Sequence, residues 1–153
     1  MSLETVLVAV GGSDEGRIDP LAETTVDIAG PAEATVALAH VFTSEEYESA
    51  RSNLNFAPES EMTPDGVAKR YTTIRELGDA MEAAGVDFTW HGRLADDDDS
   101  HGEVVVALAE ELDADLVVIG GEKRSPAGKA VFGSTAQEIL LEAPCPVTFV
   151  RSE

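Results

Sequence analysis

The chain has little of what several common protein classes require. Its one cysteine, Cys145, excludes an internal disulfide. No apolar run approaches the roughly 20 residues that a membrane-spanning helix needs. The first residues, MSLETVLVAV, have no basic region ahead of their apolar part, as a secretory signal would have. We therefore expect a cytoplasmic protein that does not interact with membranes.

Basic residues are also scarce. Ten lysines and arginines face 30 acidic residues, which gives a net charge of −20, and the acids are spread along the chain. Salt screens the repulsion between such charges, so this surface suits a protein that works in concentrated salt. We predict halophilic adaptation; metal storage and a basic partner are the alternatives. Nucleic-acid binding is disfavoured because phosphate backbones need a broad basic surface.

Short apolar runs alternate with amphipathic segments, which is typical of an α/β protein. A helix is expected from Asp19, as its cap, toward Ala29, and one long helix between Thr63 and Gly85. Ser100 and Glu103 have the spacing of a capping box at the start of another helix. Residues 43–63 are expected to form a loop, with at most a short helix. The predicted strands are 5–10, 34–42, 86–91, 114–121 and 146–151, and the last helix is 134–142. Residues 1–153 are thus predicted to be one domain, a doubly wound five-stranded parallel sheet with helices on both faces.

Two glycine-bearing segments follow predicted strands. Gly11-Gly12-Ser13 comes directly after the first strand, and the segment that begins at Gly120 ends with Gly133-Ser134-Thr135 at a helix start. In open parallel sheets, ligands bind beyond the carboxyl ends of the strands. Ser134 and Gln137 have capping-box spacing, and the remaining free amides of a helix start favour an anion.

The second of these segments, GGEKRSPAGKAVFGST, is basic in an acidic chain. Its three cations and one acid give 3 − 1 = +2. Lysine and arginine here could neutralise phosphate; alternatively, they are surface residues that pair with local acids. No GxxxxGK[ST] loop is present. The candidate phosphate-binding residues are Gly11, Gly12, Ser13, Gly120, Lys123, Arg124, Gly128, Lys129, Gly133, Ser134 and Thr135.

Other candidate sites are weaker. Asp96–Asp99 lacks the spacing of a calcium loop, so a solvated acidic loop is favoured. The three histidines, His40, His91 and His101, are too far apart in sequence to suggest a metal site. Cys145 lies between two prolines at a strand start, which favours burial over reactivity. The sequence shows no serine nucleophile motif and no phosphoacceptor aspartate.

From VLVAVGGSDEG to ADLVVIGGEKRSPAGKAVFGSTAQEILLEAPCPVTFVR, the chain resembles the universal stress protein family. This resemblance implies a sheet of five parallel strands, a regulatory or protective role under stress rather than catalysis, and frequent dimerisation. It also implies ATP or AMP as the ligand in some members, with magnesium, and no nucleotide in others.

Two positions depart from the family's nucleotide-binding pattern. Gly120 and Gly133-Ser134 fit the spacing of glycines, but Lys123 stands where a second glycine is expected. The family's Val-Asp-Gly-Ser is replaced here by Val10-Gly11-Gly12-Ser13, without the carboxylate. Two functions therefore remain open: a nucleotide-binding stress regulator, and an interaction module that has lost nucleotide binding. Slow ATP hydrolysis would lack a positioned base.

The final strand is predicted to lie at an edge of the sheet. We expect Val147–Val150 to pair antiparallel with the same strand of a second copy, as the resemblance implies; the alternative is an edge covered by a helix or loop. The sequence does not identify a protein partner.

Overall fold

A computed structural model describes residues 3–11, 16–53, 64–95, 100–121 and 134–151; of Arg51, Asn53 and Ser134 it describes the backbone alone. The sheet has five parallel strands in the order β3-β2-β1-β4-β5. These strands are β1 (Thr5–Val10), β2 (Thr35–Thr43), β3 (Phe88–Ala95), β4 (Leu116–Gly121) and β5 (Val147–Arg151). The predicted fold class is confirmed, and β5 lies at an edge as expected.

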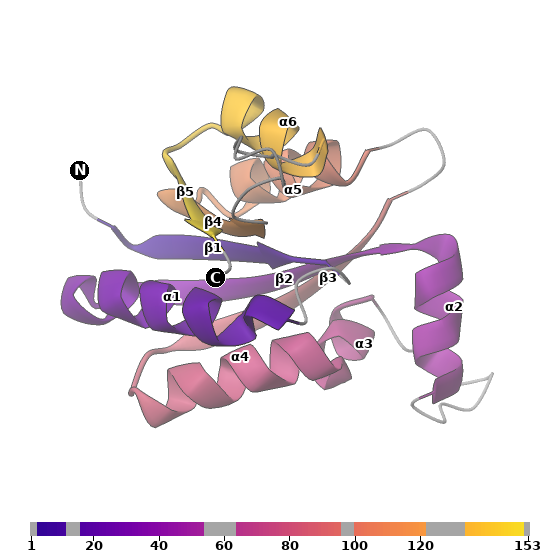
Figure 1. Ribbon diagram of the computed structural model, residues 1–153, viewed down its shortest axis with the longest axis horizontal. Coiled ribbons are helices and arrows are strands. Elements are labelled where there is room, and N and C mark those ends of the chain that lie inside the picture. Colours follow the sequence, from indigo (N-terminus) through magenta and orange to yellow (C-terminus); the bar gives the residue numbers. More distant parts are fainter. Residues whose placement is uncertain (1–2, 12–15, 54–63, 96–99, 122–133, 152–153) are drawn as a thin grey trace, which may run out of the picture.

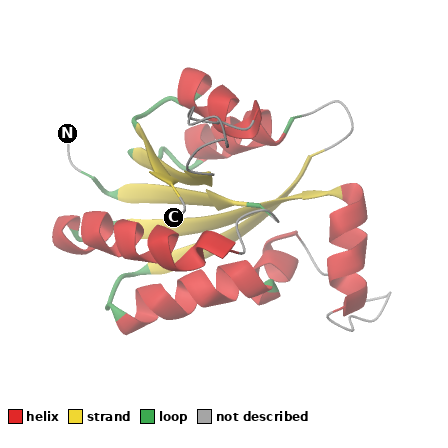
Figure 2. Cartoon of the chain, viewed as in Figure 1, coloured by secondary structure: helices red, strands yellow, loops and turns green. Residues whose placement is uncertain are grey.

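Helices cover both faces of this sheet (Figures 1 and 2). α1 and α4 lie against one face with α3 beside them, α5 and α6 lie against the other, and α2 stands across the far end of β2 (Figure 1). The described helices are α1 (Ile18–Ala32), α2 (Ser44–Asn53), α3 (Pro64–Arg70), α4 (Thr72–Ala83), α5 (His101–Glu111) and α6 (Ser134–Glu142).

The two faces of the sheet bury separate apolar cores. Side chains alternate between faces along a strand, so Val6 and Val8 of β1 pack toward α1 and α4, while Leu7 packs toward α5 and α6. All of them are fully buried. This double burial explains why the strands are nearly continuous apolar runs in the sequence.

Several predicted helix boundaries differ from the structure. α1 begins at Ile18 with Arg17, not Asp19, at the N-cap, and it continues through Pro31 in its last turn. Residues 44–53 form α2, the short helix that the sequence prediction allowed within residues 43–63. The expected long helix is two helices, because Tyr71 has extended backbone angles and its ring packs against His40 and Phe42.

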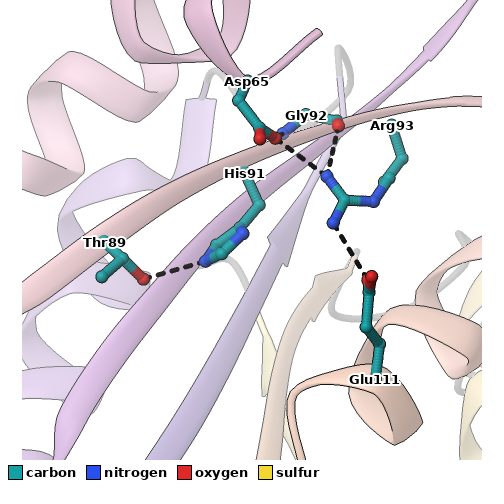
Figure 3. A network of polar contacts seen from close by, with 6 residues as sticks. All are labelled: Asp65, Thr89, His91, Gly92, Arg93 and Glu111. Atoms are coloured by element: carbon teal, nitrogen blue, oxygen red, sulfur yellow. Dashed lines mark hydrogen bonds and ion pairs between the residues drawn. The ribbon is translucent and has the colours of Figure 1, made fainter.

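Strand β3 runs four residues beyond the predicted end at His91, to Ala95. Polar side chains at its outer edge explain both the extension and the missed prediction. Asp65 of α3 accepts hydrogen bonds from the Gly92 amide and from Arg93 Nη1, each at 2.8 Å, and Arg93 Nη2 donates to Glu111 at 3.0 Å (Figure 3). The Gly92 amide is therefore not available for pairing with a further strand.

A glycine is required at position 92 by the close approach of α3. A β-carbon built there would collide with the carbonyl oxygen of Pro64 and crowd Ala68. We predict that Gly92→Ala lowers the free energy of unfolding by about 1–3 kcal/mol, because overpacking would push α3 off the strand.

The matched control is Gly30→Ala in α1, where an added β-carbon meets no atom within 4 Å. Alanine in place of this helical glycine should raise stability by about 0.5–1 kcal/mol. Denaturant unfolding of the two variants measures both effects, and equal stability of Gly92→Ala and the parent would contradict the close approach.

Candidate functional site

The direction of the chain connections reverses between β1 and β4. These strands are neighbours, yet α1 follows β1 onto one face and α6 follows β4 onto the other. The register that pairs Ala9 with Ile119 brings Gly11 and Gly120 to adjacent carboxyl ends. In doubly wound sheets this reversal opens a crevice where ligands bind. It is the candidate site.

The described residues include part of the predicted site. Gly11, Gly120 and Thr135 are placed, and Thr135 is exposed in the first turn of α6, where the backbone of Ser134 begins the helix. The other predicted residues lie outside the described part of the chain: Gly12, Ser13, Lys123, Arg124, Gly128, Lys129 and Gly133.

Gly11 occupies an open position. A β-carbon added there meets no atom within 4 Å, and its φ lies outside the left-handed region. The backbone therefore does not require glycine at this position, and the β-carbon of a larger residue would fit.

At two helices that begin at the same edge of the sheet, side chains of the chain itself cap the N-terminus, so these amides are already hydrogen-bonded. At α2, Thr43 Oγ1 accepts the Glu46 amide and Glu46 Oε1 accepts the Thr43 amide, both at 3.1 Å. This reciprocal capping box was missed, although the T-x-x-E of residues 43–46 signals it. At α5, Ser100 accepts the Glu103 amide at 3.1 Å, as predicted, and its hydroxyl donates to Glu138 of α6.

The start of α1, which flanks the reversal, differs from these two. Its N-cap is Arg17, which makes no side-chain capping hydrogen bond and is 8% exposed. A buried cation at the positive end of a helix raises the local potential, which favours an anion nearby. The sequence contains no capping signal at Arg17, and Asp19 was predicted as the cap because it precedes Pro20.

His40 lies in β2 level with Val10, the last residue of β1. Its side chain is fully buried, with its ring 4.3 Å from Phe42 and 4.4 Å from Tyr71 between centroids. Neither ring nitrogen has a hydrogen-bond partner in the described structure. Burial lowers the pKa of His40 to about 4. His40 was not predicted as a site residue; its one sign in the sequence is a histidine within a mostly apolar strand.

The remaining candidates support no chemistry. His91 accepts or donates one hydrogen bond with Thr89 at 2.9 Å (Figure 3), and burial lowers its pKa. Cys145 is half-buried and its thiol pKa is raised by burial and by Asp115, which favours the unreactive thiol. Asp96–Asp99 lies outside the described residues, and within the described ranges no three ligating side chains gather around one point. None of the described helices is long and apolar enough to cross a bilayer.

A sequence model of the universal stress protein family matches residues 2–151, and the chain belongs to that family. A curated universal stress protein of Mycolicibacterium smegmatis is 45% identical over 53 residues, which is 35% of this chain and 40% of that protein. The alignments with curated relatives thus span less than half of the relatives' lengths.

Solved structures share the fold over the full chain. A universal stress protein in complex with cAMP is 20% identical, with a TM-score of 0.68 and complete coverage of both chains. A universal stress protein from Archaeoglobus fulgidus in complex with dAMP is 20% identical, with a TM-score of 0.64, and the match covers 99% of this chain and 100% of that one.

Proposed function

We propose that this protein is a stress-response regulator that binds an adenine nucleotide in the crevice between β1 and β4. The observation that carries the proposal is the register that sets Gly11 and Gly120 at neighbouring strand ends across the reversal. The complexes of similar structures with cAMP and dAMP support adenine as the base.

Different residues of the chain would bind different parts of the nucleotide. Amides at 133–135 would hold the phosphates at the start of α6, and Lys123, Arg124 and Lys129 would neutralise their charge. The base would lie toward β1 and β2. ATP would bring magnesium with it. The cytoplasm, as the sequence predicts, supplies such nucleotides.

The second candidate function is an interaction module without nucleotide. Its support is the pair of departures from the family pattern, Gly11 and Lys123. In this case the surface of the fold and the edges of the sheet would bind a protein partner. Added nucleotide would then leave the stability of the protein unchanged.

Calorimetry with AMP and with ATP plus magnesium, in molar salt, tests the nucleotide proposal. We expect binding by the parent and a roughly tenfold loss in affinity for Lys129→Gln, because one charge-assisted contact to phosphate is worth about 1.5–3 kcal/mol, part of which salt screens. The matched control is Lys69→Gln, since Lys69 lies 4.4 Å from the ring centre of Trp90 in another part of the fold. Absence of binding by the parent would leave the interaction module.

The open position at Gly11 allows a gain-of-function test. Gly11→Asp restores the carboxylate that the family pattern has there, and it should raise affinity for AMP about tenfold or more by adding one hydrogen-bonding partner for the nucleoside. Gly16→Asp adds the same charge at an exposed position with equal room, and it should not raise affinity. Equal effects of both variants would argue against a nucleoside contact at position 11.

We propose that a second copy of the chain pairs with β5. Of the two edges of the sheet, β3 has its Gly92 amide bonded to Asp65, whereas β5 has exposed leucines close by in sequence on α6. Leu140 and Leu141 are 40% and 79% exposed. Exposed edges and apolar side chains of this kind are typical of sites where chains associate.

Leu141→Glu should convert a dimer into a monomer, because it places a charge in the proposed apolar contact. Leu94→Glu is the control: Leu94 is 37% exposed but lies on β3, at the opposite edge. Light scattering in molar salt at micromolar concentration measures both. A monomeric parent, or equal dissociation by the two variants, would rule out the β5 dimer.

A further inference from the structure

The buried imidazole of His40 is not used by the proposed nucleotide site. A neutral imidazole carries one donor and one acceptor, and neither is satisfied within the described structure. Leaving both unmet is costly, and burying the protonated ring without a partner is costlier still. The folded chain therefore holds His40 neutral under conditions in which an exposed histidine would be charged.

The groups that face His40 come from several elements. Tyr71, between α3 and α4, and Phe42 of its own strand contribute aromatic rings. Val10 of β1 and Gly92 of β3 are its uncharged neighbours in register. Glu46 of α2 and His101 of α5 are the charged or titratable side chains that act on its pKa, the first raising and the second lowering it, and burial outweighs both.

Glu46 is the acid that could pair with a protonated His40, but it is already engaged. It accepts the Thr43 amide in the cap of α2, and His101 Nε2 lies 4.0 Å from it. If Glu46 turned toward His40, Thr43 would lose its half of the cap. Capping hydrogen bonds of this kind stabilise the start of a helix, so pairing Glu46 with a charged His40 would weaken α2.

Most of the described side chains of α2 are not buried. Among its described side chains, Tyr47 and Ala50 are buried, and the ring of Tyr47 packs 5.7 Å from that of Phe42, next to His40. The helix stands across the end of β2 rather than along a face of the sheet (Figure 1). It can leave without uncovering the main part of either core.

We propose that α2 is an acid-released flap: protonation of His40 undocks α2 from the carboxyl ends of β2 and β3, while the rest of the fold stays closed. The docked state disfavours the charged ring and the undocked state exposes it to water. Undocking therefore becomes more favourable as pH falls below about 6.5, the pKa of an exposed histidine, and the effect is complete near the lowered pKa of about 4.

Amide hydrogen exchange on the full chain in molar salt tests this. Protection factors, which remove the intrinsic pH dependence of exchange, should fall about 20-fold in α2 between pH 7 and pH 5, as the exposed imidazole becomes mostly protonated. Amides in α1 are the internal reference and should change much less. Equal losses in α1 and α2 would mean global unfolding and would overturn the proposal.

Two variants separate His40 from other titrating groups. His40→Phe fills the same aromatic space without a titrating group and should leave α2 protection nearly independent of pH. His101→Gln should keep the pH dependence because His40 remains. It removes the half-buried histidine beside Glu46, which lowers the pKa of His40, so the response should only move toward higher pH. The reverse pattern would assign the response to His101 instead.

If His40→Phe does not fold, the ring itself can be followed by NMR in the parent. The proposal expects the His40 ring to titrate together with the loss of α2 protection. Titration of His40 near pH 6.5 while α2 stays protected would overturn it.

Discussion

The reversal of chain direction between β1 and β4 is the constraint on which the rest of the molecule depends. Parallel strands put all their carboxyl ends at one edge, and the helices that follow them begin there with unpaired amides. Because α1 and α6 pack on opposite faces of the sheet, no single one of these two helices covers both strand ends. Gly11 and Gly120 lie at these two strand ends, and neither has a side chain that would keep a ligand from the backbone.

An anionic ligand at this edge must be reconciled with a chain of net charge −20. Part of the answer is that the chain's own carboxylates occupy the starts of other helices, Glu46 at α2 and Glu138 beside Ser100 at α5. At α1 the capping residue is instead a buried arginine, Arg17. Molar salt would shorten the range of the remaining repulsion to about 3 Å, so a cation at this edge, such as Arg17, would have a strong influence on the local potential.

The sheet was predictable because both of its faces are buried, so each strand appears as an apolar run; Val6, Leu7 and Val8 show this most clearly. What the sequence did not show was set by contacts between distant segments. The break at Tyr71 depends on rings contributed by β2, and the extension of β3 depends on Asp65, 27 residues before Gly92. The local pattern of apolar residues predicts neither the break at Tyr71 nor the extension of β3. Glycines after two strands were predictable from the sequence, and the structure places Gly11 and Gly120 at neighbouring strand ends. The unpartnered state of His40 was not predictable, because it depends on side chains from distant segments.

The two edges of the sheet differ, and the difference bears on the proposed dimer and the candidate site. At β3 the Asp65–Arg93–Glu111 contacts join α3 to α5 around the strand, closing that side of the fold (Figure 3). At the other edge, Val150 and Arg151 of β5 pair directly with Gly120 and Gly121 of β4. A second chain bound along β5 would therefore order the same strand end that forms one wall of the crevice. Linkage is reciprocal, so a ligand that fixed the end of β4 would strengthen association by the same factor by which association strengthened its own binding.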